Sequence, residues 1–387
     1  MEEKCQEIKR FKDINIKEMF KKIREMARKG PLPASRGIRS SNGHILWEPE
    51  DIAKRWEEYI ASLFHDDREE ADDKTTSYES GHSILKEVRW ALQHCKPGKA
   101  AGLGEVVVEM LISLQEDGVD VLWSLFENIC ETGQIPSEML KSIFIAILKK
   151  SNTLDCENHR TISLMARTLK LFLKIILRRI IRIILPQIPT HQYGFMPERG
   201  TRNAIFVLRM LCERSIEHQQ EVFLCFIDYQ KAFDKVRHSQ LLTILKRIGI
   251  DGKDFRNIRN LCYEQKAAFK LTEGLTEWTD IKRGVRQGCV MSPDLFNLYS
   301  EFILNELEVE KGIQVNGRLT DNIRYADNTV LLASSEAGLQ MLVNIVQTSS
   351  EKFGLKLNIN KTKVMVMSKQ SPNEPLLQSG LTATQVR

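Results

Sequence analysis

The spacing of apolar residues predicts several helices in this chain. A charged helix is expected before residue 30, where a Gly-Pro-Leu-Pro breaker ends it, and a second over residues 51–64, where apolar side chains recur at helical intervals. Further helices are predicted over residues 84–94, 106–131, 168–184 and 294–306. The last of these is predicted to have Ser292 as its cap and Pro293 in its first turn.

Short runs of β-branched and aromatic residues predict the strands. These runs cover residues 143–148, 222–227, 323–325, 329–333 and 364–367. Helical patterns separate most of them, which indicates an α+β chain. Residues 65–80 are polar and acidic without periodicity, so we predict a linker there and a domain boundary.

Composition excludes several classes of protein. The eight cysteines are scattered without a C-x-x-C pair, so neither a zinc site nor a disulfide framework is indicated, and a reducing intracellular compartment is expected, either nucleus or cytoplasm. No secretory signal opens the chain. The most apolar stretch, residues 169–185, is interrupted by basic residues and does not predict a membrane span, so a soluble protein is expected.

Positive charge is concentrated in one part of the chain. Residues 141–210 hold 13 Lys and Arg against three Asp and Glu, although the net charge of all 387 residues is only +5. On the predicted helix, four basic residues recur at every fourth position and form one stripe: Lys170, Lys174, Arg178 and Arg182. Such a stripe suits a polyanion, because each neutralised phosphate releases a counterion. A solvated charged face is the alternative.

Two aspartates are candidates for metal binding. Asp228 closes the apolar run 222–227, and Asp327 lies in a turn between two predicted strands. Nucleotidyl transfer by two divalent metals needs carboxylates that converge, and neighbouring strand ends would supply them. Taken singly, either residue is explained as well by a structural role, since Asp often satisfies nearby backbone amides in turns.

Motifs along the chain strengthen the catalytic interpretation. In order they are ENHRTISL at 157–164, QYGF at 192–195 with RGT at 199–201, FIDYQKAFD at 226–234, GVRQGCVMSP at 284–293, YADN at 325–328, and GLKLN at 354–358 with KTK at 361–363. With these motifs the sequence resembles the reverse transcriptase family, and specifically its LINE-type (non-LTR retrotransposon) branch. The last four are similar to the family's palm motifs A to D, and the resemblance covers about residues 40–368.

The resemblance implies a right-hand polymerase fold: a palm with an antiparallel sheet flanked by helices, and fingers of helices and strands. The expected parts are a helical N-terminal extension (1–64), a linker (65–80), a helical pre-fingers region (81–145), fingers (146–221), a palm (222–368) and a disordered tail (369–387). Nothing after Met367 resembles a thumb, which is expected to be missing. The region before the fingers is too short for an endonuclease, so another protein would have to cut the target.

The resemblance also implies the reaction machinery. Asp228 and Asp327, with Asn328 beside them, would hold two Mg²⁺ ions, or Mn²⁺. Lys361 matches the lysine thought to protonate the leaving pyrophosphate, and Lys363 is a close competitor.

The same resemblance assigns contacts with the nucleotide and the template. Lys149 and Arg160 would bind the triphosphate, where Arg can engage phosphate in a bidentate way. Phe233 would exclude a 2′-hydroxyl by its bulk, although it also suits an ordinary core position. Gln287 and Gly288 would lie beside the incoming nucleotide. The basic stripe and Arg199 would contact the backbone of the template RNA.

Asn328 departs from the family, whose motif C ends in two aspartates. An amide oxygen carries no charge and binds Mg²⁺ more weakly. We therefore expect metal affinity or activity to fall by at least about 10–100-fold, which is the loss known for replacing residues that only support the metal ligands.

Two hypotheses follow from this departure. One is an RNA-directed DNA polymerase that uses an RNA template, a DNA primer and deoxynucleoside triphosphates, impaired by Asn328 and the absent thumb. The other is a non-catalytic nucleic-acid-binding remnant of such an enzyme. An RNA-copying viral polymerase is disfavoured, because Phe233 stands where such enzymes need room for a ribose hydroxyl.

Overall fold

The computed structural model describes residues 37–67, 84–98, 102–104, 106–113, 115–149, 153–305, 312–315 and 318–368. Three predicted segments lie wholly or mostly outside these ranges: the charged helix before residue 30, the linker over 65–80 and the tail over 369–387. No helix in the described ranges is long and apolar enough to cross a bilayer.

The strands predicted in the second half of the chain form one sheet. They are β5 (Val222–Ile227), β10 (Asn322–Tyr325), β11 (Asn328–Ala333) and β12 (Lys363–Met367), in the order β10-β11-β5-β12. Every neighbouring pair is antiparallel. The antiparallel sheet expected for a palm is therefore present.

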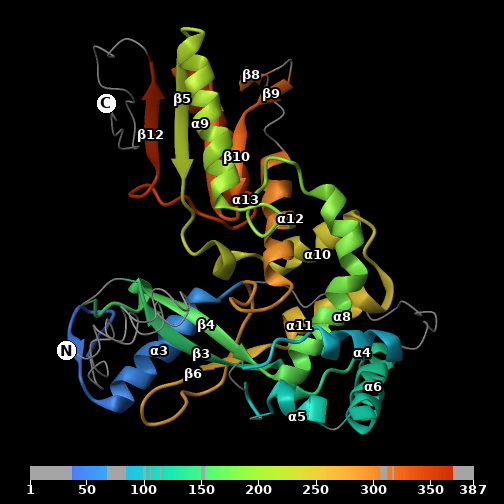
Figure 1. Cartoon of the computed structure of the whole chain (residues 1–387). Helices are drawn as coiled ribbons and strands as arrows, with labels where there is room; N and C mark the ends of the chain where they lie inside the picture. The colour runs from blue at the N-terminus through green and yellow to red at the C-terminus, as the bar shows by residue number, and fades with distance from the viewer. Residues whose placement is uncertain are drawn as a thin grey trace, which may run out of the picture.

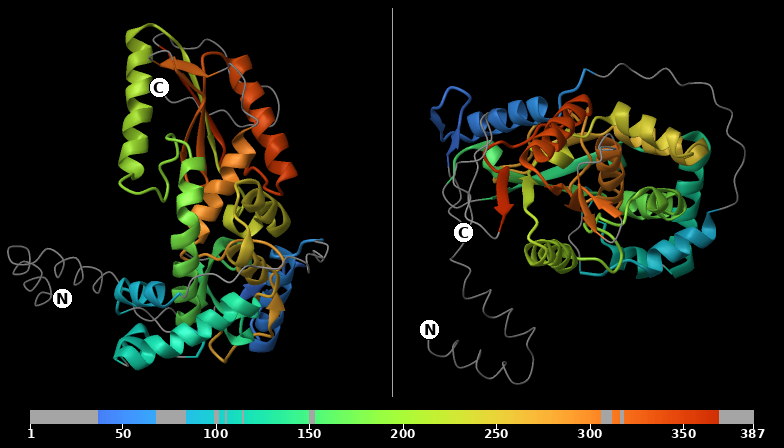
Figure 2. Two further views of the ribbon diagram at one scale, coloured as in Figure 1. Left: turned by 90° about the vertical axis from the view of Figure 1, so that its right-hand side faces the viewer. Right: turned by 90° about the horizontal axis from the view of Figure 1, so that it is seen from above.

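Two helices cover the two faces of this sheet. α9 (Thr201–Glu217) packs on one face and α13 (Glu336–Lys352) on the other, as Figure 2 (left) shows. Successive residues of a strand point to opposite faces, so Leu224 joins the core under α9 whereas Cys225 joins the core under α13. Burial from both sides explains why the sequence of β5 is a continuous apolar run.

A second sheet lies at the other end of the molecule (Figure 1). It consists of β3 (Lys141–Leu148), β4 (His159–Met165), β6 (Lys266–Phe269) and β7 (Thr279–Asp280), in the order β4-β3-β6-β7. β3 pairs antiparallel with β4 and parallel with β6. The strand predicted over 143–148 is confirmed, whereas the residue pattern does not indicate the other three.

The helix α3 (Pro49–Leu63) packs against this second sheet. Its Trp56 ring lies 4.2 Å from the ring of Phe269 in β6 and 5.3 Å from that of His159 in β4, measured between centroids. A hairpin of β1 (Ile38–Arg39) and β2 (Ile45–Leu46), which turns at residues 41–43, precedes the helix. The described residues before position 67 therefore form a layer together with β4 and β6.

Helices fill the space between and beside the two sheets (Figure 1). They are α4 (Leu85–Gln93), α5 (Val108–Ser113), α6 (Gln115–Thr132), α8 (Arg167–Ile184), α10 (His238–Arg247), α11 (Gly252–Tyr263) and α12 (Ser292–Leu304). The apolar face of α8 is buried, and its Phe172 ring lies 5.2 Å from that of Phe126 in α6. The shorter elements are α7 (Ser137–Leu140), η1 (Cys156–Asn158), η2 (Leu185–Gln187), η3 (Ala232–Lys235), β8 (Ile313–Val315) and β9 (Arg318–Thr320).

Two helix predictions are corrected. The single helix predicted over 106–131 is wrong, because α5 and α6 are separate and Gln115 at the start of α6 has a φ of 50°, which an uninterrupted helix does not allow. Ser292 is not a cap: it is the first residue of α12, and Met291 occupies the cap position without a side-chain hydrogen bond. Pro293 does lie in the first turn, as predicted.

Replacing Phe172 by Ala is expected to lower the free energy of unfolding by about 3–5 kcal/mol, because the fully buried ring would leave a cavity. Urea unfolding followed by circular dichroism measures the change. Phe206→Ala is the matched control, since that ring on α9 is 61% exposed and should cost less than about 0.5 kcal/mol. Similar costs for both variants would contradict the packing described for α8.

Candidate metal and nucleotide site

Two acidic residues far apart in the sequence meet at one edge of the first sheet. Asp228 follows the last residue of β5, and Asp327 lies in the loop that joins β10 to β11. β5 and β11 run antiparallel with Ile227 opposite Thr329, so the end of β5 lies beside the start of β11. Both acids line one cavity of about 650 Å³. The predicted meeting of the two acids at neighbouring strand ends is confirmed.

Most of the other residues predicted for the reaction line the same cavity. They are Lys361, Lys149, Arg160, Phe233, Gln287 and Gly288. Asn328 is the exception: it is the first residue of β11, its side chain is exposed, and it does not line the cavity. The structure therefore brings together two of the three predicted metal ligands.

Lys361, rather than its competitor Lys363, reaches the acids. Its Nζ lies 2.7 Å from Oδ2 of Asp228, whereas Lys363 begins β12 and does not line the cavity. The Lys361 side chain is 65% exposed, so this ion pair contributes little to stability. A divalent cation that bound Asp228 would compete with the ammonium for the same oxygen.

The electrostatics of the acid pair favour a bound cation. Burial raises the pKa of Asp327, its own backbone N–H lowers it, and the charge of Asp228 raises it again. A cation between the two carboxylates would relieve their repulsion. Within the described ranges, no group of three or more His, Cys, Asp or Glu could hold a metal. Asp228 and Asp327 together supply the carboxylate oxygens that a hard divalent cation prefers.

Two cations lie on the wall contributed by the second sheet. Lys149 follows β3 and Arg160 lies in β4. Burial lowers the pKa of Lys149, and the nearby charge of Lys361 lowers it further. Lys149 Nζ also donates to the Glu157 carbonyl at 3.2 Å, which directs the side chain. This wall suits the phosphates of a nucleotide.

An aromatic ring forms another part of the lining. Phe233 lies in η3, after Lys231 has taken a left-handed φ of 52°. Its ring stacks on Phe296 of α12 with centroids 4.4 Å apart, and Phe195 meets its edge at 6.2 Å. Phe233 is therefore both packed against the core and exposed to the cavity. A role in the core and a role in excluding a 2′-hydroxyl are compatible with this position.

The sequence did not assign a role to Asp234, which also lines the cavity. Burial raises its pKa to about 6, and its Oδ1 accepts a hydrogen bond from Gln287 Nε2 at 3.3 Å. Gly284, with a φ of 93°, lies against the backbone of Asp234, and a Cβ at this position would lie only 2.8 Å from the Asp234 carbonyl oxygen. Asp234 thus orients the side chain predicted to lie beside the nucleotide.

Part of the basic stripe on α8 is taken up by contacts with neighbouring elements. Lys174 Nζ lies 5.2 Å from the centre of the Trp90 ring of α4 and donates to the His94 carbonyl at 2.6 Å. The Arg178 guanidinium lies 4.2 Å from the same ring. Burial lowers the pKa of Lys170, whereas Arg182 is exposed.

Arg199, predicted to contact nucleic acid with the stripe, lies on a different element. Its guanidinium donates to the carbonyls of Thr190 and Gln192 at 2.8 and 3.1 Å. Neither Arg199 nor any residue of the stripe lines the cavity that holds the acids.

A buried arginine supports the hairpin that carries Asp327. Arg324 of β10 is 1% exposed, and its guanidinium pairs with Glu301 of α12. It also lies 2.8 Å from His191 Nε2, which must accept because Arg has only donors. Burial, together with the charge of Arg324, lowers the pKa of His191 to about 4.

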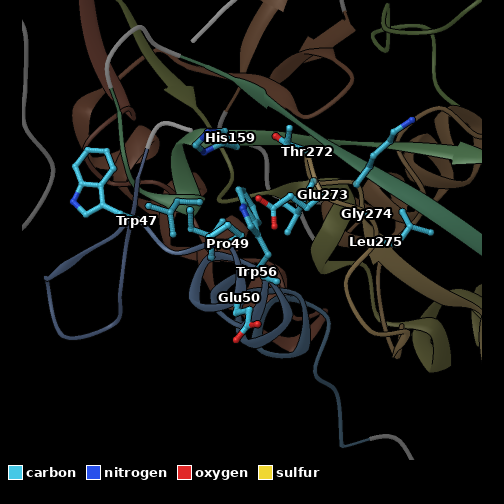
Figure 3. A pocket seen from close by; sticks show the side chains of 14 residues that line it. Trp47, Pro49, Glu50, Trp56, His159, Thr272, Glu273, Gly274 and Leu275 are labelled. Carbon is cyan, nitrogen blue, oxygen red and sulfur yellow. The ribbon is translucent and has the colours of Figure 1, made fainter. Parts of the chain in front are cut away.

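A second cavity, of about 620 Å³, lies between α3 and the loop after β6 (Figure 3). Trp56 and Leu275 are among its walls, and His159 lines both this cavity and the one that holds the acids. No sequence motif points to it as a unit, because its residues come from segments that pair only in the folded chain.

A family model described as reverse transcriptase (RNA-dependent DNA polymerase) matches residues 147–382, which is more than half of the chain. An antiparallel sheet with two acids at one edge is the arrangement expected for a polymerase palm. The family match identifies the class of polymerase as reverse transcriptase. The chain belongs to the reverse transcriptase family, and the LINE-type assignment made from its motifs is confirmed. Members of this family use divalent metal ions and act on a template, a primer and nucleotides.

Relatives resemble this chain over part of their length. The Pol polyprotein from type-1 retrotransposable element R2 of Nasonia vitripennis is 27% identical over 63% of this chain and 24% of the relative. The polyprotein from the type-2 element R2DM of Drosophila melanogaster is 30% identical over 44% and 16%. The RNA-directed DNA polymerase from mobile element jockey of the same species is 23% identical over 81% and 34%. This chain thus spans about a third or less of these relatives.

Among solved structures, an apo telomerase of Candida tropicalis truncated from its C-terminal domain is similar over 62% of this chain and 52% of that chain, with 13% identity and a TM-score of 0.46.

His191 is expected to make the protein less stable in acid. Its folded-state pKa of about 4 lies below the unfolded value of about 6.5. The stability contributed by the neutral imidazole is therefore complete above pH 6.5 and is lost as the pH falls towards 4. Between pH 7.5 and pH 5, the parent should lose about 2 kcal/mol more than His191→Gln. Urea unfolding at both pH values measures this difference, and equal losses would count against the buried neutral histidine.

Proposed function

We propose that this chain copies an RNA template into DNA by nucleotidyl transfer at two Mg²⁺ ions, for which Mn²⁺ can substitute, and that Asn328 weakens the reaction. The substrates would be a primed template and deoxynucleoside triphosphates. The observation that supports the proposal is the meeting of Asp228 and Asp327 in one cavity, with the cations Lys149 and Arg160 on its wall.

Asp228 and Asp327 would hold the metal ions, which activate the primer hydroxyl and neutralise the leaving pyrophosphate when bound. Lys361 lies 2.7 Å from Asp228, so it is already beside the reacting groups. Once Asp228 is bound to a metal ion, the Lys361 ammonium would no longer pair with it and could turn towards the leaving group and donate a proton to it.

The remaining cavity residues would bind the nucleotide. Lys149 and Arg160 would hold the triphosphate through charge-assisted hydrogen bonds. Phe233 is fixed by its stacking on Phe296, so its ring would present a rigid barrier to a 2′-hydroxyl. Gln287 and Gly288 would lie along the base and sugar, with the amide of Gln287 held by Asp234.

The template would contact a separate basic surface. Arg182 and Arg178 are exposed on α8 and can reach phosphates, although Arg178 also lies over Trp90 of α4, whereas Lys174 already donates a hydrogen bond to the chain after α4. Lys170 is partly buried on the same helix, and Arg199 is partly buried on a different element, so each would contribute less to this contact. Such contacts would be independent of template sequence.

A second candidate function is nucleic-acid binding without catalysis. Asn328 favours it, because this residue is neutral and does not line the cavity, so of the three predicted metal ligands only Asp228 and Asp327 remain. The basic surface of α8 would retain its affinity for RNA in that case.

Primer extension on an RNA template with Mg²⁺ or Mn²⁺ separates the two candidates. Asn328→Asp should raise the extension rate by about 10–100-fold, because it restores a negative charge beside the acid pair. Asp228→Ala should abolish extension. Asn344→Asp on α13 and Asp280→Ala in β7 are matched exposed controls that should leave the rate unchanged.

The outcome of these assays decides the proposal. Extension that depends on Asp228 and rises with Asn328→Asp supports an impaired polymerase. If every variant fails to extend while RNA binding persists and weakens with salt, the binding function replaces it.

Phe233→Val is expected to reduce the preference for deoxynucleotides over ribonucleotides by about tenfold or more, since a smaller side chain leaves room for the 2′-hydroxyl. The ratio of kcat/KM for the two nucleotides measures the effect. Phe302→Val truncates a half-buried ring of α12 that does not line the cavity, so it should leave the ratio unchanged. An unaltered ratio in Phe233→Val would assign that ring to packing alone.

A further inference from the structure

We propose that Gln192 is a positioning residue, whose buried carboxamide fixes the hairpin loop that carries Asp327 and thereby sets the spacing of the acid pair. Gln192 does not line the cavity, so it would act without touching metal or substrate. The catalytic consequence rests on the proposed polymerase function, whereas the structural claim does not.

The loop that carries Asp327 is under conformational constraint. Tyr325 pairs with Asn328, which leaves only Ala326 and Asp327 to turn the chain. Ala326 takes a φ of 57°, which costs free energy in a residue with a Cβ. Such a loop keeps this conformation only where its surroundings hold it.

Gln192 supplies the contact that holds the loop. Its Oε1 accepts hydrogen bonds from the backbone N–H of Ala326 at 3.0 Å and from that of Gly194 at 2.8 Å. The side chain is 0% exposed, so water does not compete for these donors. Because both neighbours are donors, the oxygen rather than the nitrogen must face them.

The other end of the same amide supports a specific role. Gln192 Nε2 is buried and has no hydrogen-bond partner within the described ranges. An unsatisfied buried N–H group is unfavourable, and an apolar side chain of this size would avoid it. The acceptor oxygen is therefore what distinguishes Gln192 from a space-filling residue.

The segment around Gln192 is fixed on both sides. Residues 191–193 run beside β10: Arg324 N–H donates to the His191 carbonyl at 2.9 Å, and Tyr193 N–H donates to the Arg324 carbonyl at 2.8 Å. Asn297 of α12 donates to the Gly194 carbonyl at 2.8 Å. Contacts from α12 to Gly194, from Gly194 to Gln192 and from Gln192 to Ala326 thus connect the helix to the loop.

The approach of Gly194 to the loop is very close. A Cβ at this position would lie 2.1 Å from the backbone nitrogen of Ala326, so only glycine fits. Asp327 is the next residue, and a small rotation at Ala326 would move its carboxylate. Metal–ligand distances tolerate only about ±0.2 Å, so the metal site depends on this backbone contact.

Gln192→Met tests the proposal, because it keeps the size of the side chain and removes the acceptor. The Mg²⁺ concentration needed for half-maximal primer extension should rise by about 10–100-fold, the effect known for residues that orient metal ligands. Gln192→Glu keeps an acceptor oxygen, so its Mg²⁺ requirement should stay close to that of the parent. The assay is run in the chain as it stands and in the Asn328→Asp background.

Hydrogen exchange gives a readout that does not need activity. In Gln192→Met, backbone amides of residues 322–333 should exchange about tenfold faster or more, whereas those of residues 141–148 should not change. Asn257→Leu is the control, because it removes an equally buried amide from α11 and should leave the hairpin unaffected. If Gln192→Met does not fold, Gln192→Asn shortens the side chain by one methylene and should show the same local effect.

Each outcome bears on one claim. Unchanged exchange and an unchanged Mg²⁺ requirement in Gln192→Met overturn the proposal. So does faster exchange throughout the molecule without a change in Mg²⁺ requirement, or a Gln192→Glu variant as impaired as Gln192→Met. If no variant or parent extends a primer, the polymerase function fails, and the exchange rates of the hairpin still decide the role of Gln192.

Discussion

The antiparallel pairing of β5 with β11 is the interaction on which the site depends. It places the end of β5 beside the β10–β11 loop, and so converts two distant acids into neighbours. Because side chains alternate between faces, a register shift of one residue would move every core side chain of β5 from one buried face of the sheet to the other, where it would meet the wrong helix. Both faces of β5 are covered, by α9 and by α13, and this burial fixes the register. The core therefore determines the geometry of acids that it does not touch.

The N-terminal part of the chain contributes to the same site from the other side. Lys235 Nζ of η3 donates to the Leu63 carbonyl at the end of α3 at 2.7 Å, and Lys231 Nζ lies 4.3 Å from the centre of the Tyr59 ring. Burial lowers the pKa of both lysines to about 8. The short helix that presents Phe233 is thus held between α3 and α12, which makes one wall of the cavity a joint product of two distant segments.

The features predicted from sequence are those whose cause is local. β5 was predictable because a buried strand needs a continuous apolar run, and the loop of Asp327 because a turn must separate two strands. β6 was missed because it is short, lacks β-branched residues and pairs with a strand far away in the chain. For the same reason the QYGF motif gave no role for Gln192: its acceptor matters only because residues 191–193 lie beside β10. The basic stripe was placed correctly on one helix, but its contact with Trp90 depends on packing that periodicity does not encode.

Asn328 alters charge more than architecture. Its pairing with Tyr325 closes the hairpin through backbone groups, which Asp or Asn supplies equally. Its side chain is exposed at the strand end, so a carboxylate there would add a negative charge beside the cavity without displacing a neighbour. That charge would strengthen the attraction for divalent cations. It would also help a cation to displace the Lys361 ammonium from Asp228. With the amide, the proposed ligands Asp228 and Asp327 would have to do this alone, so Asn328 would raise the metal concentration that the proposed site needs while the loop, Gln192 and the cavity stay in place.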